Sequence, residues 1–236
     1  QPPEHTVRSA DVAFLQYTSG STSAPKGVRV THGNIAAQME LFGTYSGFSR
    51  ASRLVSWLPV HHDMGLVAKL LTPVWFGCFT AFMAPASFLR QPARWLRMIT
   101  AYRGTLSGGP NFAYALLTSR VTEEEKATLD LSSWKRAYNG AEPVHPPTLA
   151  RFAAAFASCG LHPSSVTPCY GLAEATLQVS GIWREAGPRV LTVDAVALRR
   201  GEVSPSTSGT ELASSGAVHP GVEVTILDGE GRALGA

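Results

Sequence analysis

Short apolar runs alternate along the chain with longer segments in which apolar residues recur every three or four positions. The short runs predict buried strands, and the longer repeat predicts helices with one buried face. The expected strands are Leu54–Leu58, a strand within Val74–Met83, Gly104–Ser107, Lys135–Tyr138 and Val166–Cys169. The expected helices are the stretch after Asn34 to about Tyr45, Phe88–Tyr102, the stretch after Pro110 to about Arg120, Pro147–Cys159 and Leu172–Val179. Strands that alternate with helices predict an α/β fold with a mixed or parallel sheet flanked by helices.

Polar loops follow several of these strands. Four of them carry residues with chemical potential: His61–Gly65, Ser107–Phe112, Asn139–Glu142 and Tyr170–Thr176. The carboxyl ends of parallel strands meet at one edge of a sheet, where open α/β folds bind their ligands. The sequence therefore predicts that these loops surround a common site.

Composition narrows the classes of function. The 236 residues are 44% hydrophobic and 16% charged, as expected for a globular protein with a large core. Twenty basic and seventeen acidic side chains leave a net charge of +3 without a Lys/Arg cluster, so nucleic acid is not an expected partner. Cys78, Cys159 and Cys169 have neither metal nor redox spacing, which favours reduced thiols in a cytoplasmic protein.

One charge-free run is long enough to cross a bilayer. Leu70–Leu89 contains 20 residues and no charged side chain. Pro73, Gly77 and Pro85 interrupt it, and these residues favour a buried strand with turns. No membrane span is therefore expected.

The segment Thr18–Gly27, with the sequence Thr-Ser-Gly-Ser-Thr-Ser-Ala-Pro-Lys-Gly, lies between the apolar runs Val12–Leu15 and Val28–Val30. Its glycines let backbone N–H groups approach an anion, its hydroxyls add donors, and Lys26 adds a positive charge. It is not a Walker loop, because Pro25 stands where that motif has its second glycine. The alternative is a Ser/Gly linker, although linkers seldom end in Pro-Lys-Gly between two strands. The pattern favours a phosphate-binding loop.

Three interpretations of His61–Gly65 remain open. Adjacent histidines in an extended segment point to opposite faces, which disfavours one shared metal ion. A plain buried turn is the second interpretation. In the third, which we favour, one imidazole borders a carboxylate or phosphate of a ligand, while Met64 and Leu66 line an apolar cavity.

The remaining loops carry weaker signals when each is taken alone. The small residues of Asn139–Glu142 would let a flat purine lie against the backbone, but an ordinary Asn-Gly turn has the same sequence. The glycine pair in Ser107–Phe112 would let an extended chain pass close to the backbone, yet such strand ends are common. Tyr170 offers an aromatic face for a purine, and Glu174 offers a carboxylate for a hard cation beside phosphates. A lone Glu174 is more often a solvated charge.

Taken together, these segments resemble the adenylate-forming superfamily, which includes acyl-CoA synthetases, peptide-synthetase adenylation domains, luciferases and fatty acyl-AMP ligases. Thr18–Gly27 resembles the signature loop of that superfamily, and Tyr170–Thr176 resembles its adenine and metal segment. The forms His-His-Asp-Met-Gly and Leu-Ala-Glu-Ala-Thr are typical of fatty acyl-AMP ligases. Ala173 stands where many members have Thr, so no side-chain role is assigned to it. The resemblance covers about Phe14 to Leu227.

The resemblance implies roles for individual residues. The catalytic residues would be Lys26, His62 and Glu174, with Glu174 binding Mg²⁺. The phosphates of ATP would be bound by Thr18, Ser19, Gly20, Ser21, Thr22 and Lys26. Adenine would be bound by Asn139, Gly140, Ala141, Glu142, Tyr170 and Gly171. The acyl chain would be bound by His62, Asp63, Met64, Gly65, Gly108, Gly109, Pro110 and Phe112.

The resemblance also implies a domain organisation. Residues 1–182 would form an α/β adenylation core with the ATP and acyl sites. Residues 183–211, rich in Gly, Pro and Ser, would be the insertion that distinguishes fatty acyl-AMP ligases, and residues 212–236 the β-rich start of the next subdomain, with a strand at Val222–Leu227. The ribose-binding aspartate and the C-terminal catalytic domain of the family have no counterpart in the sequence, so a fragment of this extent is expected to be inactive alone.

The activity implied is ATP- and Mg²⁺-dependent activation of a fatty acid to acyl-adenylate, with release of pyrophosphate. The acyl group would pass to an acyl carrier protein of a polyketide, peptide-synthetase or lipid pathway. A long-chain acyl-CoA synthetase is the alternative. A non-catalytic nucleotide- or acyl-binding module is the alternative from another class, and the presence of Lys26, Tyr170 and Glu174 speaks against it.

Overall fold

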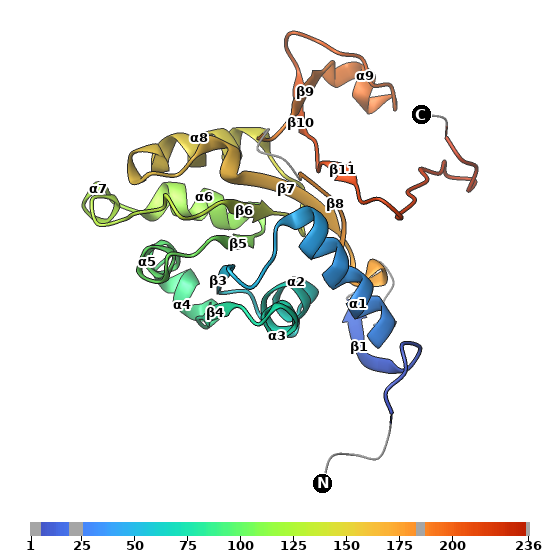
Figure 1. The fold of residues 1–236 in the computed structure, drawn as a ribbon. Coiled ribbons are helices and arrows are strands. Elements are labelled where there is room, and N and C mark those ends of the chain that lie inside the picture. Colours follow the sequence, from blue (N-terminus) through green and yellow to red (C-terminus); the bar gives the residue numbers. More distant parts are fainter. Residues whose placement is uncertain (1–5, 19–25, 183–186, 235–236) are drawn as a thin grey trace.

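A seven-stranded mixed sheet forms the centre of the molecule (Figure 1). The computed structural model describes residues 6–18, 26–182 and 187–234. In spatial order the strands are β11 (Ala217–Val218), β8 (Gln178–Gly181), β7 (Val166–Gly171), β6 (Arg136–Asn139), β5 (Leu106–Gly109), β3 (Arg53–Ser56) and β4 (Phe79–Phe82). Strands β4, β3, β5, β6 and β7 are parallel, and β8 and β11 are antiparallel to their neighbours. The predicted α/β class with a mixed sheet is confirmed.

Helices cover both faces of this sheet. The described helices are α1 (His32–Leu41), α2 (Asp63–Gly65), α3 (Thr72–Phe76), α4 (Pro85–Arg90), α5 (Ala93–Tyr102), α6 (Asn111–Arg120), α7 (Glu123–Lys126), α8 (Pro146–Phe156) and α9 (Ala195–Arg199). Of these, α9 lies away from the sheet (Figure 1). Wider π-helical turns, η1 (Phe42–Ser46) and η2 (Leu66–Leu71), follow α1 and α2. Shorter 3₁₀ turns are η3 (Ala157–Cys159), η4 (Pro163–Ser165) and η5 (Ala173–Ala175).

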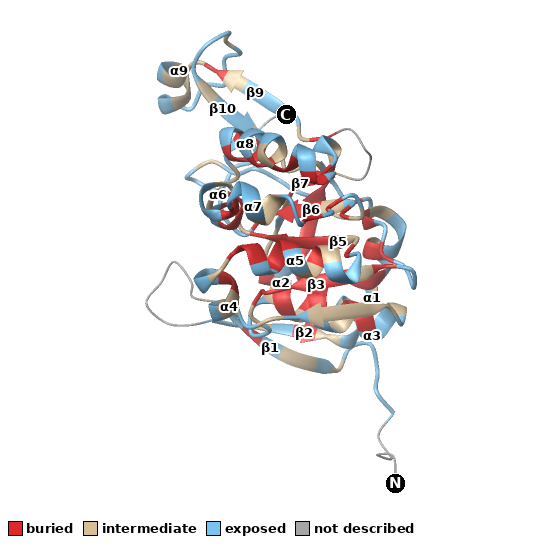
Figure 2. Cartoon of the chain, turned by 90° about the vertical axis from the view of Figure 1, so that its left-hand side faces the viewer, coloured by how far each residue is buried: buried red, intermediate tan, exposed pale blue. Residues whose placement is uncertain are grey.

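Apolar side chains that point alternately to the two faces of the sheet form two hydrophobic cores, one on each face. Val55 and Ala137 belong to the larger core, which α5, α6 and α8 complete. Their neighbours Leu54 and Tyr138 belong to the smaller core, with residues of α1, η1 and η2. Successive side chains of a strand point to opposite faces, so each central strand supplies both cores. Figure 2 shows the buried residues concentrated along the sheet and the inner faces of the helices.

Two smaller antiparallel sheets flank the main one. Strands β1 (Val12–Thr18) and β2 (Lys26–Thr31) form a hairpin, and β9 (Val190–Val193) pairs with β10 (Thr210–Ala213). A capping box at Thr31 and Asn34 ends β2 and begins α1: the Thr31 hydroxyl accepts from the Asn34 N–H, and the Asn34 side chain accepts from the Thr31 N–H. The chain therefore turns directly from the hairpin into the helix that covers the smaller core.

Three local predictions were wrong. Phe88–Tyr102 was predicted as one helix, but Pro92 separates α4 from α5, because the residue before a proline is excluded from the helical region. Leu172–Val179 was predicted as a helix, but it contains the short η5 and the start of β8, which pairs with β7. Val222–Leu227 was predicted as a strand; within the described residues its only β-pairing is a single bridge from Leu227 to Ala233.

The charge-free run Leu70–Leu89 is interrupted at the predicted positions, but its structure is mostly helical. Pro73 lies in the first turn of α3, Gly77 ends that helix with φ +62°, and Pro85 begins α4. Only Phe79–Phe82 is a strand. Among the helices that the structure describes, none has the length and apolar character needed to cross a membrane.

Candidate functional site

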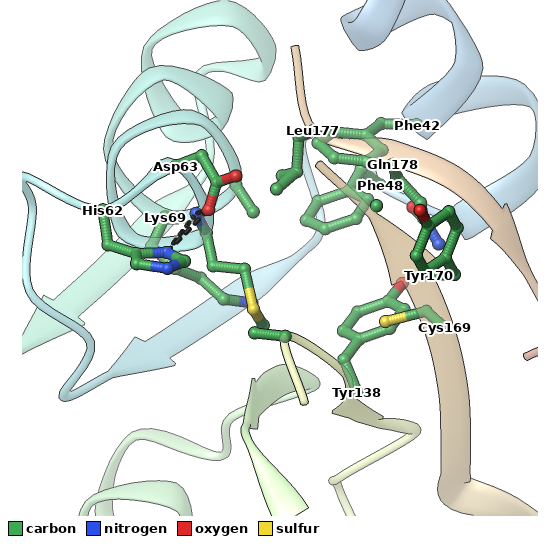
Figure 3. Close-up of a pocket in the computed structure, with 14 residues that line it drawn as sticks. Phe42, Phe48, His62, Asp63, Lys69, Tyr138, Cys169, Tyr170, Leu177 and Gln178 are labelled. Atoms are coloured by element: carbon green, nitrogen blue, oxygen red, sulfur yellow. Dashed lines mark hydrogen bonds and ion pairs between the residues drawn. The ribbon is translucent and has the colours of Figure 1, made fainter. Parts of the chain in front are cut away.

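A pocket opens beside the carboxyl ends of β6 and β7 and encloses about 170 Å³ of space (Figure 3). Parallel strands that end together bring the loops after them to this point. The lining residues are Phe42, Phe48, His62, Asp63, Met64, Ala68, Lys69, Tyr138, Ala141, Cys169, Tyr170, Gly171, Leu177 and Gln178. Three of the predicted loops thus contribute to one cavity, as the positions of the strands in the sequence predict.

The His61–Gly65 segment forms a tight turn against the end of the preceding loop. A methyl group on Gly65 would lie 2.0 Å from the Pro59 carbonyl oxygen, so only glycine allows this approach. The Gly65 N–H donates to the His62 carbonyl oxygen, and His62 is the N-cap of α2. This turn places His62 and Asp63 on one side of the pocket (Figure 3), and Met64 also lines the pocket.

His62 and Asp63 form a close pair at that side. The His62 Nδ1 atom lies 2.6 Å from Asp63 Oδ1, and the Met64 N–H also donates to this oxygen at 2.6 Å. The hydrogen bond to Asp63 raises the pKa of His62, against the opposing effect of burial. Because Nδ1 donates to the carboxylate, Nε2 is the ring nitrogen left for a ligand, and protonation makes it a donor.

Replacing Asp63 by Asn is expected to lower the pKa of His62, because the largest cause of its elevation is the hydrogen bond to the carboxylate. The folded state binds the proton more tightly than the unfolded state, so this pair stabilises the fold at low pH. That contribution is lost as the pH rises through the pKa of folded His62. An NMR titration of the imidazole protons measures the pKa, with His162 as internal control. An unchanged His62 titration in Asp63→Asn contradicts the pairing.

The two predicted adenine-binding segments approach each other across β6 and β7. Ala141 has φ +69°, an unusual conformation for a residue with a side chain, and it lines the pocket. Tyr170 lines the pocket from the end of β7, with 52% of its surface exposed. Asn139 is fully buried, and its Oδ1 atom accepts no hydrogen bond from the described residues. A half-exposed aromatic ring beside backbone of unusual conformation forms a surface on which a flat base can lie.

Two residues of the Asn139–Glu142 loop also have structural contacts. The Glu142 carboxylate accepts from the Phe112 N–H at 2.6 Å, which satisfies a free donor at the start of α6. A methyl group on Gly140 would lie 2.8 Å from the Cys169 carbonyl oxygen, so close packing between β6 and β7 explains this glycine. These contacts hold the loop in place whatever it binds.

The signature loop is described only at its two ends. Thr18, the last residue of β1, pairs in register with Lys26, the first residue of β2, and Lys26 is exposed. The predicted phosphate-binding residues Ser19, Gly20, Ser21 and Thr22 lie outside the described residues. The hairpin brings the two ends of the loop face to face.

Several predicted residues do not line the pocket. Glu174 lies in η5, exposed and without an ion pair in the part of the chain that the structure describes. Phe112 is 42% exposed and packs edge-on against Trp57. Methyl groups on Gly108 and Gly109 would meet the Tyr138 carbonyl oxygen at 2.4 Å and the Trp57 ring at 2.8 Å. Packing against β6 therefore explains Gly108, and packing against the Trp57 ring explains Gly109. Pro110 caps α6.

Sequence patterns did not identify the inner wall of the pocket. Phe48, Tyr138 and Lys69 line it, and all three are buried. Tyr138 was predicted only as part of a strand, and no role was assigned to Phe48 or Lys69. The described residues contain no cluster of three or more His, Cys, Asp and Glu arranged to hold a metal ion.

The chain is similar to known proteins over most of its length. The family model for AMP-binding enzymes matches residues 1–236. A medium-chain-fatty-acid–acyl-carrier-protein ligase from Teredinibacter turnerae is 46% identical over 200 residues, which cover 85% of this chain and 31% of that protein. A long-chain-fatty-acid–AMP ligase from Mycobacterium marinum is 41% identical over 217 residues, which cover 88% of this chain and 37% of that protein.

Solved structures show the same relationship. The fatty acyl-adenylate ligase from L. pneumophila, in complex with acyl adenylate and pyrophosphate, superposes with a TM-score of 0.89 at 44% identity. The match covers 95% of this chain and 40% of that one. The chain thus spans between about a third and two-fifths of the length of these relatives.

Proposed function

Because the chain belongs to the AMP-binding enzyme family and is homologous to fatty acyl-AMP ligases, we propose that it carries the ATP and acyl site of an enzyme that activates a fatty acid. The reaction converts the carboxylate and ATP into acyl-adenylate and pyrophosphate. The observation that carries the proposal is the pocket that Ala141, Tyr170 and the His62–Asp63 pair line together, with Tyr170 across the pocket from that pair (Figure 3).

The reacting groups need charge neutralisation, because a carboxylate must approach the α-phosphorus of a polyanion. His62 supplies a donor at the edge of the pocket, and the pair with Asp63 favours its charged form. A cationic donor beside the carboxylate lowers the repulsion between the two substrates. His62 accordingly orients the carboxylate, and Tyr170 stacks on the adenine.

Lys26 and the hydroxyl loop bind the β- and γ-phosphates in this proposal. The register of the hairpin holds Lys26 opposite Thr18, so the two described ends of the loop are fixed. An exposed carboxylate without a partner suits Mg²⁺, which is bound through one or two carboxylates together with substrate phosphates. Glu174 has this character within the described residues. The metal would supply positive charge for the departing pyrophosphate.

ATP–pyrophosphate exchange tests the proposed function in the complete natural polypeptide that carries this sequence. Labelled pyrophosphate should enter ATP only when a fatty acid is present, because exchange requires reversible formation of acyl-adenylate. The Tyr170→Ala variant should weaken ATP binding while it leaves the fold intact, since the ring is half exposed. Absence of exchange with every acid contradicts the proposal.

The acyl acceptor is proposed to be an acyl carrier protein, on the basis of relatives named for that activity. Residues 1–182 then form the adenylation core, 183–211 an insertion and 212–236 the start of the following subdomain. The described part of the insertion contains β9 and α9, and β10 begins at its last two residues. The Asp194 carboxylate accepts from the Val196 and Ala197 N–H groups and so caps α9.

Shortening this insertion is expected to raise acyl-CoA formation relative to acyl-AMP. Replacing residues 194–209 by a two-residue turn keeps the pairing of Val193 with Thr210 and removes α9. If the insertion restricts the domain movement needed for CoA chemistry, the smaller element relieves that restriction. Product separation with CoA present measures the ratio. An unchanged ratio, with acyl-AMP formation intact, argues against this role of the insertion.

A further inference from the structure

Lys69 is a buried cation on the wall of the pocket. Its surface is 1% exposed, and its Nζ atom donates to none of the hydrogen-bond acceptors that the structure describes. The ammonium lies 5.4 Å from the centre of the Tyr138 ring and 6.0 Å from that of Phe48. Aromatic faces attract a cation, but they do not accept its three N–H groups as a carboxylate or carbonyl would. The ammonium therefore has unmet hydrogen-bonding capacity.

The local fold directs this side chain inward. Val67, Ala68 and Lys69 are three consecutive buried residues in η2, a π-helical stretch that is wider than an α-helix. Burying an unpaired charge is unfavourable by several kcal/mol, so a position of this kind is rarely retained for packing alone. Lys69 lines the pocket on the same side as the His62–Asp63 pair.

Lys69 lies deeper in the pocket than the residues proposed to contact the reacting carboxylate and ATP. The His62 side chain is 52% exposed, and Tyr170 is 52% exposed, so both lie at the mouth of the pocket. The carboxylate must meet ATP at that mouth in the proposed function. Lys69, at 1% exposure, faces the interior, and in the proposed function the remainder of the acyl chain would extend toward it.

We propose that Lys69 selects acyl substrates that carry an oxygen acceptor away from the reacting carboxylate. This inference rests on the proposed function and adds the class of acid. A second carboxylate, a keto oxygen or a hydroxyl group accepts from the ammonium and completes its hydrogen bonds. A plain alkyl chain leaves the buried ammonium unpaired, so an unsubstituted acid is disfavoured relative to an oxygenated acid at this depth.

The test is acyl-AMP formation by the complete natural polypeptide with matched pairs of acids. Each pair has one chain length and differs only in a distal carboxyl, keto or hydroxyl group. The wild-type protein should prefer one oxygenated series by about 10- to 100-fold in kcat/KM, the range for a hydrogen bond to a charged group. Comparison of the three oxygenated series identifies which acceptor Lys69 binds.

Lys69→Met is the deciding variant, since Met keeps the length and removes the charge. It should abolish or reverse the preference, while Lys135→Met, at an exposed position outside the pocket, leaves it unchanged. Equal use of plain and oxygenated acids by the wild-type protein overturns the inference, as does a preference that survives in Lys69→Met. An equal loss for all acids in that variant assigns Lys69 to the reacting carboxylate and also overturns it. Absence of product with every acid instead refutes the proposed function.

A second readout separates selection from a structural role. Burial lowers the pKa of Lys69 from 10.5 to about 8, with Cys169 and Cys78 as the nearby titratable groups that oppose the shift. His62, Asp63, Tyr138 and Tyr170 line the same pocket. Between pH 8 and 10.5 the unfolded state holds the proton that the folded state has lost, so stability rises with pH. Without substrate, Lys69→Met should have a higher melting temperature than the wild-type protein at pH 7, because it removes a buried charge. Above pH 10.5 Lys69 is neutral in both the folded and the unfolded state, so this difference should disappear. A lower melting temperature of Lys69→Met at pH 7 would instead assign Lys69 a structural role and contradict the inference.

Discussion

Replacing Glu174 by Gln is expected to lower the rate of acyl-AMP formation by about 100-fold or more, the range for loss of a group that stabilises charge in the transition state. The substitution keeps the size of the side chain and removes only the negative charge. Glu174 is exposed in η5 and makes no ion pair with other described residues, so the fold does not depend on that charge. The defect should therefore appear in turnover, with the melting temperature unchanged.

A matched control separates the metal role from general effects of charge. Glu124 is exposed on α7, and Glu124→Gln should leave turnover unchanged. Titration of Mg²⁺ at saturating ATP supplies the more specific measurement, because Glu174→Gln should need more Mg²⁺ to reach half its maximal rate. Full activity of Glu174→Gln at low Mg²⁺ contradicts the assignment of this carboxylate.

Replacing Gly171 by Ala is expected to destabilise the protein by about 3 kcal/mol or more, because the added methyl group meets backbone that cannot move aside. That group would lie 1.9 Å from the Leu177 carbonyl oxygen. The same oxygen accepts from the Leu172 N–H at 2.8 Å, at the irregular pairing of β7 with β8. Gly171 also lines the pocket, so any folded variant should bind ATP poorly.

Gly229→Ala is the control for this prediction. A methyl group at Gly229 meets nothing within 4 Å, and the position is exposed. Urea unfolding should therefore give Gly171→Ala a lower free energy of unfolding than Gly229→Ala, and the difference should be most of the destabilisation predicted for Gly171→Ala. Equal stability of Gly171→Ala and Gly229→Ala shows that β7 and β8 can separate at this point, which contradicts the close approach.

The order of strands and polar loops was predictable because it depends on short-range patterns. Apolar runs located β3, β5, β6 and β7, and the rule that ligands bind at the carboxyl ends of parallel strands placed Ala141 and Tyr170 at one site. The resemblance to adenylate-forming enzymes, which the comparisons confirm, supplied residue roles that periodicity does not contain. These roles remain predictions.

The errors arose where tertiary partners decide the local structure. Residues 172–179 have a helical pattern, but β8 pairs with the edge of β7 and overrides it. Apolar and polar residues alternate over residues 222–227, as in a strand. The segment forms no sheet because, among the described residues, it has no neighbouring strand to pair with beyond the single bridge at Leu227. Lys69 was missed because its burial depends on the π-helical turn of η2, which no simple sequence period predicts.

The most direct test of the central claim is separation of the products formed from ATP, Mg²⁺ and a panel of fatty acids by the complete natural polypeptide. Each reaction is run with and without CoA. We predict acyl-AMP and pyrophosphate in equal amounts, with little acyl-CoA when CoA is added. Abundant acyl-CoA would contradict the ligase type, and binding of ATP without any acyl-AMP would contradict the proposed chemistry itself.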